Sequence, residues 1–283
     1  MYLKRRENFM KQSVKELKVT AGEIRKDIVK MVHASASGHP GGSLSAADIL
    51  SALYFNVMNI DPENVKMEER DKFVLSKGHA APVLYSSLAR RGYFSTDELL
   101  TLRKIGSFLQ GHPDMKGTPG VEMSTGSLGQ GFSSSIGMAL SAKLDNSPSR
   151  TFVLLGDGEL NEGIVWEAAM SAAHYKLDNL TAVLDYNGLQ IDGPNDKVMG
   201  VSPVDRKFES FGWNVIKIDG HNFEEILKAF DSAKSTKGIP TIIIAKTIKG
   251  KGVSFMENNA GWHGKAPSDE ELEIALKELG GDK

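Results

Sequence analysis

Short apolar runs alternate with amphipathic segments along most of the chain. Runs rich in β-branched residues predict buried strands at residues 73–76, 151–155, 180–185, 214–218 and 241–245. Segments with apolar residues at helical spacing predict helices at residues 14–35, 45–55, 82–90, 128–144, 164–172, 202–211, 222–235 and 269–279. Strands that alternate with helices indicate an α/β fold, in which a parallel sheet carries helices on both faces.

Segments rich in Gly and Pro interrupt this pattern. The sequence SGHPGG at residues 37–42 is predicted to break the first helix, and residues 108–126 and 246–265 are predicted loops. Ser95, with Glu98 three residues later, is typical of a helix that starts with a capping box. No linker rich in Pro, Gly or Ser divides the chain, so we expect one domain over residues 1–283.

Composition narrows the class of protein. A net charge of −2 and a pI of about 6.4 do not favour a nucleic-acid partner. The basic run at Lys4–Arg6 lies in a tail of mixed charge, where we expect a solvated lead-in to the first helix. The chain has no Cys, no apolar run long enough to span a bilayer and no apolar signal region after its basic residues. We therefore expect a cytoplasmic enzyme with no membrane partner.

The stretch from Gly156 to Gly193 carries the most specific chemistry. It reads GDGELNEG, then a helical pattern, a strand and DYNGLQIDG, with Asn187 placed 30 residues after Asp157. One strand–helix–strand unit would bring Asp157 and Asn187 to the same carboxyl edge of the sheet, where open α/β sheets bind ligands. A carboxylate, an amide oxygen and a backbone carbonyl suit Mg²⁺ or Ca²⁺, with phosphate oxygens completing the shell.

Four histidines lie beside Gly in breaks between regular elements. They are His39 in SGHPGG, His79 in SKGHAAP, His112 in QGHPD and His263 in GWHGKAP. Gly permits a close approach of the backbone to a ligand, and the spacing of these histidines matches no common zinc pattern. The other three, His33, His174 and His221, lack that context and are interpreted as structural or surface residues.

One further Gly-rich loop opens the helix at residues 128–144. In GSLGQG (126–131), backbone N–H groups at the helix start could face an anion. Tight packing of a small-residue helix explains Gly129, Gly131 and Gly137 equally well. The loop matches neither a Walker loop nor a dinucleotide fingerprint.

Together these motifs resemble a known family. The pair GDG…DYN is similar to the thiamine diphosphate signature, although Gly188 stands where that signature often has a second Asn. SGHPGGSLSAADIL, LSKGHAAPVLY, GHPD, STGSLGQG, GDGELNEG, DYNGLQIDG and WHGKAP resemble, in the same order, the N-terminal, diphosphate-binding half of transketolase. The resemblance implies a thiamine diphosphate-binding fold and transfer of a two-carbon ketol unit from a ketose phosphate to an aldose phosphate, with pentose phosphates as the family default.

The resemblance also implies roles for individual residues. Mg²⁺, or Ca²⁺ or Mn²⁺ in its place, would be held by Asp157, Asn187 and the Leu189 carbonyl. Thiamine diphosphate would be contacted by His79, Gly126, Leu128, Gly158, Asn187, Ile191 and His263. The catalytic group would be His39, His112 and His263, which would surround the reacting sugar together with His79, and Glu162, which would lie at the subunit interface.

The family's remaining domains have no counterpart in this sequence. The chain therefore resembles the smaller subunit of a split transketolase. We expect a partner with the pyrimidine-binding and C-terminal domains, an α2β2 assembly, an activating Glu and a phosphate clamp on that partner, and no activity alone. The alternatives are an alpha-type subunit of a 2-oxoacid dehydrogenase, a deoxyxylulose-phosphate synthase relative, and a non-catalytic relative of the fold.

Overall fold

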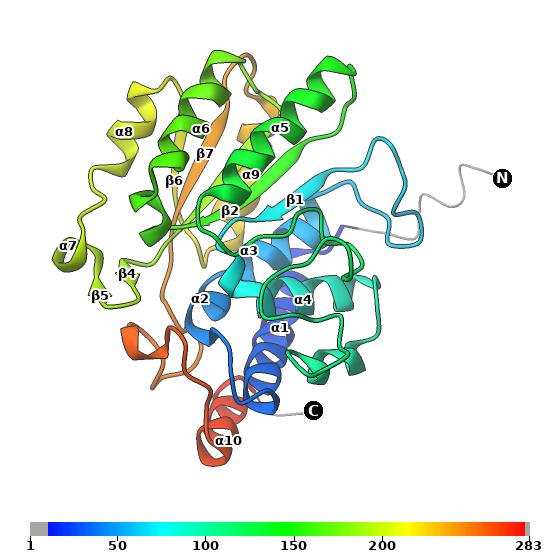
Figure 1. The fold of residues 1–283 in the computed structure, drawn as a ribbon, viewed down its shortest axis with the longest axis vertical. Helices are drawn as coiled ribbons and strands as arrows, with labels where there is room; N and C mark the ends of the chain where they lie inside the picture. Colours follow the sequence, from blue (N-terminus) through cyan, green and yellow to red (C-terminus); the bar gives the residue numbers. More distant parts are fainter. Residues whose placement is uncertain (1–10, 281–283) are drawn as a thin grey trace.

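Five parallel strands form the predicted sheet. The computed structural model describes residues 11–280, and within them the strand order is β1-β2-β3-β7-β6 (Figure 1). The strands are β1 (Lys72–Leu75), β2 (Thr151–Gly156), β3 (Leu180–Tyr186), β6 (Asn214–Asp219) and β7 (Thr241–Lys246). Each predicted strand is confirmed to within one residue at either end.

Helices cover both faces of the sheet, as expected. One core joins Phe73 and Leu75 of β1 to the helices at residues 14–34 (α1), 47–52 (α3), 81–91 (α4) and 223–235 (α9). A second core joins Val74 to the helices at residues 130–144 (α5), 163–174 (α6) and 204–210 (α8). Successive residues of β1 therefore point to opposite layers, as strand geometry requires. Burying each such aliphatic or aromatic side chain stabilises the fold by roughly 1.5–3 kcal/mol.

Most predicted helices are confirmed with small shifts at their ends. They are α1 (Val14–Ala34), α4 (Ala81–Arg91), α5 (Gln130–Leu144), α6 (Gly163–His174), α8 (Val204–Ser210), α9 (Phe223–Ser235) and α10 (Asp269–Glu278). Ser13 and Ser268 begin α1 and α10 with capping boxes. Asn222 caps α9 through its side-chain oxygen, which accepts hydrogen bonds from the N–H groups of Glu224 and Glu225.

The prediction for residues 37–55 is wrong in detail. A helix, α2 (Pro40–Ser45), begins inside the expected break, because Pro40 occupies the first helical turn, where its fixed φ and missing N–H are favourable. The expected single helix at 45–55 is instead α3 (Ala47–Ala52), followed by a π-helical turn, η2 (Leu53–Val57).

One other local prediction is corrected, and one segment for which none was made contains short elements. Ser95 begins a 3₁₀ helix, η4 (Thr96–Thr101), and its hydroxyl accepts from Asp97 N, so the capping box with Glu98 does not form. The DYNGLQIDG segment contains a small antiparallel pair, β4 (Leu189–Gln190) and β5 (Gly193–Pro194), followed by α7 (Asn195–Val198). Short 3₁₀ turns, η3 (Gly78–Ala80), η5 (Gly158–Asn161) and η6 (Ala260–Trp262), complete the elements of the described chain.

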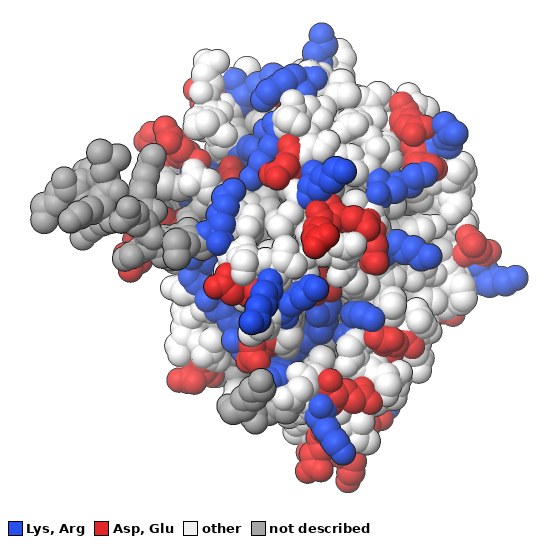
Figure 2. Space-filling view, turned by 180° about the vertical axis from the view of Figure 1, so that it is seen from behind, with Lys and Arg blue, Asp and Glu red and all other residues white. Residues whose placement is uncertain are grey.

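Surface charge and hydropathy agree with the composition. On the face turned away from the view of Figure 1, Lys and Arg are interspersed with Asp and Glu (Figure 2). None of the helices in the described part of the chain is long and apolar enough to cross a membrane. The basic run Lys4–Arg6 lies outside the described residues.

Candidate active site

Asp157 and Asn187 leave the same edge of the sheet from adjacent strands, as predicted. Asp157 follows β2, Asn187 follows β3, and the two strands pair in register at Gly156 and Asp185. The carboxyl ends of parallel strands therefore place a carboxylate and an amide side by side.

The Asp157 carboxylate is buried and held by two backbone donors. Its side chain accepts hydrogen bonds from Gly158 N at 2.9 Å and Gly188 N at 2.5 Å, and the residue is 2% exposed. Burial, and next the nearby negative charge of Asp185, raise the pKa of Asp157 to about 6. The two backbone donors and the Lys77 ammonium offset this rise in pKa only in part, so the negative charge of the ionised form is incompletely compensated.

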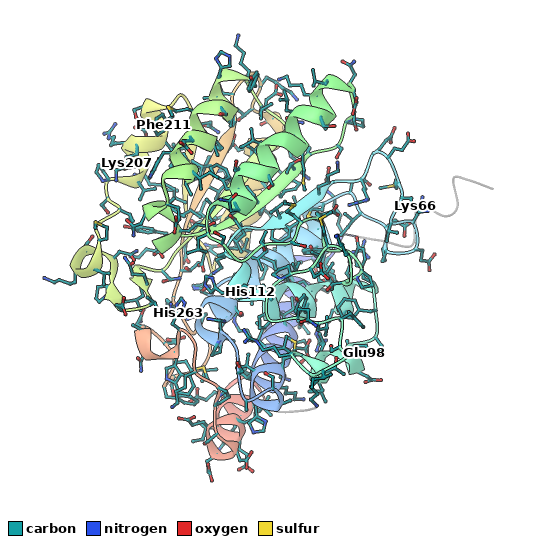
Figure 3. All side chains as sticks on the ribbon, viewed as in Figure 1. Lys66, Glu98, His112, Lys207, Phe211 and His263 are labelled. Atoms are coloured by element: carbon teal, nitrogen blue, oxygen red, sulfur yellow. The ribbon has the colours of Figure 1, made fainter. Side chains whose placement is uncertain are left out.

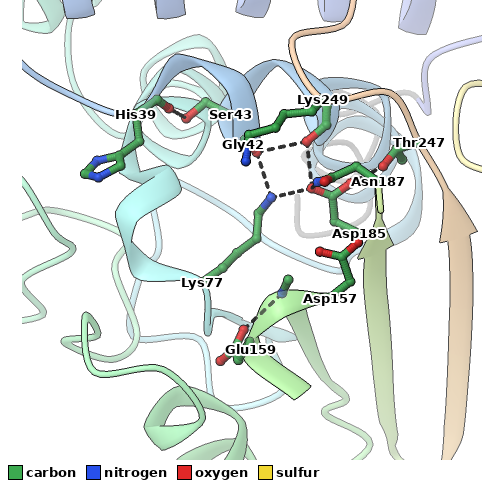
Figure 4. Close-up of polar contacts among 12 residues, drawn as sticks. His39, Gly42, Ser43, Lys77, Asp157, Glu159, Asp185, Asn187, Thr247 and Lys249 are labelled. Carbon is green, nitrogen blue, oxygen red and sulfur yellow. Dashed lines mark hydrogen bonds and ion pairs between the residues drawn. The ribbon is translucent and has the colours of Figure 1, made fainter. Parts of the chain in front are cut away.

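Asp185, below Asn187, is neutralised by a buried lysine (Figure 4). The Lys77 ammonium forms an ion pair with Asp185 and donates to Gly42 O at 2.7 Å. The hydroxyls of Ser45 and Thr247 also donate to Asp185. Burial opposes ionisation of Asp185, but the Lys77 charge and these hydrogen bonds outweigh it and lower its pKa.

The oxygen donors fit a hard divalent cation. Asn187 Oδ1 accepts from Leu189 N at 3.1 Å, and its Nδ2 donates to Asp185 at 3.4 Å, which orients the amide. Across residues 11–280, no three His, Asp or Glu side chains form a ready-made metal cluster. A cation here would therefore rely on the Asp157 carboxylate, amide and carbonyl oxygens, and non-protein oxygens such as phosphate, which is the chemistry of Mg²⁺ or Ca²⁺.

The four loop histidines gather into one cluster. The ring centroid of His39 lies 5.3 Å from His79, 5.4 Å from His263 and 6.4 Å from His112, and His79 and His263 stack at 5.0 Å. Figure 3 shows His112 and His263 near α2 in the middle of the molecule. The buried Nδ1 of His39 has no hydrogen-bond partner within residues 11–280, as expected of a group that faces a ligand.

These imidazoles are held neutral at physiological pH. Burial, followed by the positive charge of Arg103, lowers the pKa of His39 to about 4. Burial and Lys249 lower the pKa of His263 to about 3, and burial and Lys77 hold that of His79 well below its usual value. The pKa of His112 is also lowered, by burial and then by Arg103. A cluster of neutral imidazoles can accept and donate protons on sugar oxygens.

Lys249 interacts both with the histidine cluster and, electrostatically, with the carboxylates of Asp157 and Asp185. It is 2% exposed, and its Nζ donates to His263 Nδ1 at 2.9 Å. Burial and then Lys77 lower its pKa to about 8, against the attraction of Asp157 and Asp185. Lys249 and the imidazoles could therefore contact a polyphosphate whose charge is shared with a cation at Asp157.

The GSLGQG loop is explained by packing and an internal carboxylate. Glu159, 1% exposed, accepts from Gly129 N at 2.7 Å, Gly156 N at 3.0 Å and the Ser76 hydroxyl. Gly129 has φ +82°, and a Cβ there would clash with the Ile164 side chain. A Cβ on Gly137 would meet nothing within 4 Å, so packing does not explain that glycine.

The remaining predicted residues lie around the same edge, and their roles stay predictions. A Cβ on Gly126 would lie 3.3 Å from the His112 ring, and one on Gly158 would lie 2.9 Å from Gln190. Leu128 is half-buried, Glu162 is exposed at the start of α6, and Ile191 is 63% exposed. Exposed apolar surface beside a polar site is available to a ligand or a partner.

The three other histidines lie outside the cluster. His33 contacts Asp269 of α10 at 2.7 Å, and the exposed His174 packs edge-on against Tyr175. His221 Nδ1 lies 2.7 Å from Asp48, and its Nε2 accepts from Ile248 N at 2.9 Å. These contacts join α10 to α1 and the loop after β7 to α3, which agrees with the structural interpretation.

Sequence reasoning missed the charged residues that support the site. Lys77, Glu159 and Asp185 are buried within motifs already singled out, and Lys249 lies in a segment predicted only as a loop. A charged residue next to a buried strand was the available signal, since such residues are rarely buried unless paired.

Comparisons with known proteins all point to transketolase domains and subunits. The family model "Transketolase, thiamine diphosphate binding domain" matches residues 17–283. The chain is 46% identical over 264 residues to the 6-deoxy-6-sulfo-D-fructose transketolase subunit SqwG of Clostridium sp. (strain MSTE9), covering 93% of this chain and 96% of that protein. It is 42% identical to an apulose-4-phosphate transketolase subunit of Phocaeicola vulgatus, with 94% of each chain covered.

The fold also matches solved structures. Transketolase from Leishmania mexicana superimposes with a TM-score of 0.90 at 32% sequence identity, over 96% of this chain. The match covers 42% of the Leishmania chain, so this chain spans less than half the length of that relative.

Proposed function

The chain belongs to the transketolase family through its thiamine diphosphate-binding domain, and we propose that it is the diphosphate-binding subunit of a two-chain transketolase. Its reaction would be transfer of a two-carbon ketol unit from a ketose phosphate, or a related anionic ketose, to an aldose phosphate. The observation that carries the proposal is the position of Lys249, which hydrogen-bonds His263 of the imidazole cluster and is attracted by the carboxylates of Asp157 and Asp185.

Different residues of the chain would contact different parts of the cofactor and its cation. Asp157, Asn187 and the Leu189 carbonyl would hold Mg²⁺, and His79, Gly158, Lys249 and His263 would face the diphosphate. Gly126, Leu128 and Ile191 would lie against the rest of the cofactor. When bound, thiamine diphosphate supplies an electron sink for breaking and forming a carbon–carbon bond next to a carbonyl.

The histidines would move protons on the sugar. His39 has an orphaned Nδ1, and Lys249 fixes His263 by donating to its Nδ1, which leaves the proton on Nε2. His39 and His263 would therefore exchange protons with the reacting hydroxyls, and His112 would contact the terminal hydroxyl. An alpha-type 2-oxoacid dehydrogenase subunit has no need of such a cluster, so we disfavour that alternative.

Replacing His39 with glutamine is expected to lower kcat of the assembled enzyme by about 100-fold, because one proton-transfer group is lost. With pKa values of about 4 for His39 and about 3 for His263, neither limits activity between pH 6 and 8. Any acid limb that they cause would lie below about pH 5. Steady-state rates across pH 5–9 test this, with His174→Gln as a matched control that keeps wild-type rates.

The partner is part of this proposal. Two relatives of nearly the same length are named as subunits, and the rim of the site carries exposed apolar side chains, Ile191, Val198 and Met199. We propose that a second chain with the pyrimidine-binding and C-terminal domains covers this rim in an α2β2 complex, and supplies the activating Glu and the phosphate clamp. A cytoplasmic location remains part of the same proposal.

Reconstitution tests the function directly. The purified chain is expected to be inactive, and co-expression with a chain resembling the C-terminal half of transketolase is expected to give ketol transfer that depends on thiamine diphosphate and Mg²⁺. The donor panel should include pentose phosphates, apulose 4-phosphate and 6-deoxy-6-sulfofructose, because two relatives are named for the last two. Turnover by the chain alone would contradict the split site, and no cofactor binding in calorimetry with the partner present would favour a non-catalytic relative.

A further inference from the structure

Arg103 lies between two histidine loops in a backbone conformation that is unusual for its residue type. Its φ is +60°, in the left-handed region that costs a non-Gly residue roughly 1 kcal/mol or more. Its backbone N–H donates to Leu109 O at 2.8 Å, which closes the loop over residues 103–109. Such strain persists where the surrounding structure requires it, often at functional sites.

The guanidinium of Arg103 spans the loops that carry His39 and His112. Its Nη1 donates to the Ser37 hydroxyl at 3.1 Å, and its Nη2 donates to Gly111 O at 3.5 Å. Ser37 is two residues before His39, and Gly111 directly precedes His112. A Cβ on Gly111 would lie 2.8 Å from Arg103 Cζ, so the absence of a side chain at position 111 makes room for the guanidinium.

We propose that Arg103 is a positioning residue for the histidine cluster: its guanidinium braces the His39 loop against the His112 loop and supplies the positive charge that faces both imidazoles. This inference rests on the proposed function only for its effect on turnover. The brace itself is a property of the free chain and can be tested without cofactor, partner or substrate.

The charges around the two imidazoles make the proposal specific. His39 is faced by His79, His112, His263, Lys249 and Arg103. Of these, His79 and His263 have strongly lowered pKa values and are neutral near pH 7. The charges that lower the pKa of His39 are Arg103, then His112 and Lys249, whereas His112 is affected by Arg103.

Histidine titration by NMR separates the two cations. In the isolated, ring-labelled chain, Arg103→Met is expected to move the titration midpoints of both His39 and His112 upward, because a nearby positive charge is removed. Lys249→Met should move His39 and His263 upward and leave His112 in place. Arg103→Lys retains the charge and should keep both midpoints near wild type, and the exposed His174 serves as an internal reference.

A second variant tests the brace without removing the charged residue. Gly111→Ala places a methyl group against the guanidinium, which can move aside because it ends a flexible side chain. We expect the titration midpoint of His112 to rise in this variant, as it is expected to rise in Arg103→Met. Unchanged midpoints for His39 and His112 in a folded Arg103→Met chain would overturn the proposal.

Turnover of the assembled enzyme distinguishes positioning from substrate binding. Arg103→Met is expected to lower kcat about 10-fold with little change in donor KM, since a misplaced catalytic group slows the chemical step. A rise in KM confined to phosphorylated donors, with unmoved histidine midpoints, would instead make Arg103 an anion contact and overturn the positioning role. Shifted midpoints in Arg103→Met, together with a wild-type chain that forms no active enzyme with any partner, would support the brace and refute the proposed function.

Discussion

Replacing Asp157 with asparagine is expected to lower turnover of the assembled enzyme by about 10³-fold or more, and at the same time to weaken the pH dependence of the stability of the unloaded chain. The loss follows because a divalent cation contributes several kcal/mol at such sites, and about 4 kcal/mol corresponds to a factor of 10³. Mg²⁺-dependent cofactor binding by calorimetry and steady-state rates measure this loss directly.

The change in pH dependence follows from the raised pKa of Asp157. Burial and Asp185 raise it from 3.8 to about 6, so the folded state binds a proton more tightly than the unfolded chain. The stabilisation that this proton provides is complete below pH 3.8 and is lost as the pH rises through about 6, a change of up to about 3 kcal/mol. The asparagine variant does not suffer that loss.

Denaturant unfolding of the unloaded chain at pH 5 and pH 7.5 tests the stability effect. The unfolding free energy of wild type should fall relative to that of Asp157→Asn between pH 5 and pH 7.5, whereas Asp145→Asn, at an exposed position after α5, should keep the wild-type pH dependence. Equal pH dependence of wild type and Asp157→Asn would show that the carboxylate is already compensated in the empty site. Unchanged Mg²⁺ affinity in Asp157→Asn would remove Asp157 from the cation site.

Lys77→Met is expected to lower the free energy of unfolding by about 3–5 kcal/mol, because it leaves the Asp185 carboxylate buried without its counter-charge. Lys77 is 1% exposed, and Asp185 has no exposed surface, so water cannot replace the ammonium. The variant also removes the donor to Gly42 O, at the start of the helix that follows His39. Denaturant unfolding of the isolated chain measures the change.

The pH dependence of this loss has a definite sign. Because the pKa of Asp185 is lowered in the folded state, its contribution to stability is present above the unfolded pKa of 3.8 and is lost as the pH falls through the folded pKa. The difference between wild type and Lys77→Met should therefore be largest at neutral pH and shrink in acid. A difference that does not change with pH would contradict the ion-pair explanation.

Two further variants control for the loss of a lysine as such. Adding Asp185→Asn to Lys77→Met should recover part of the lost stability, because the unpaired charge is removed. Lys217→Met breaks a surface ion pair with Asp205. It should change the denaturant midpoint of unfolding little, since exposed ion pairs contribute weakly to stability.

Much of the fold could be predicted because its signals are local. Buried parallel strands are nearly continuous apolar runs, so β2 and β7 were recognisable from composition alone. Helices α9 and α10 were predicted from their helical periodicity. The helix inside SGHPGG was not predicted, because Pro and Gly were taken as helix breakers, whereas Pro40 occupies the first turn and the whole of α2 is buried.

The candidate site was predicted less completely, for a physical reason. Motif spacing placed Asp157 and Asn187 at one edge, and the Gly neighbours singled out the histidines that cluster. The support from Lys77, Lys249 and Arg103 depends on contacts between segments far apart in sequence, which no local pattern records. Glu159 illustrates the same limit, since its partners Ser76 and Gly129 lie 83 and 30 residues away.

Glu159 also sets what kind of anion recognition this chain can offer. At the start of α5, where a phosphate could otherwise bind, the Gly129 N–H already donates to the Glu159 side chain. A diphosphate would therefore be bound by other groups, such as Lys249, the imidazoles, the Gly158 backbone and a cation at Asp157. Because burial and Lys77 lower the pKa of Lys249 to about 8, the positive charge that it offers to such a ligand would fall as the pH rises past that value.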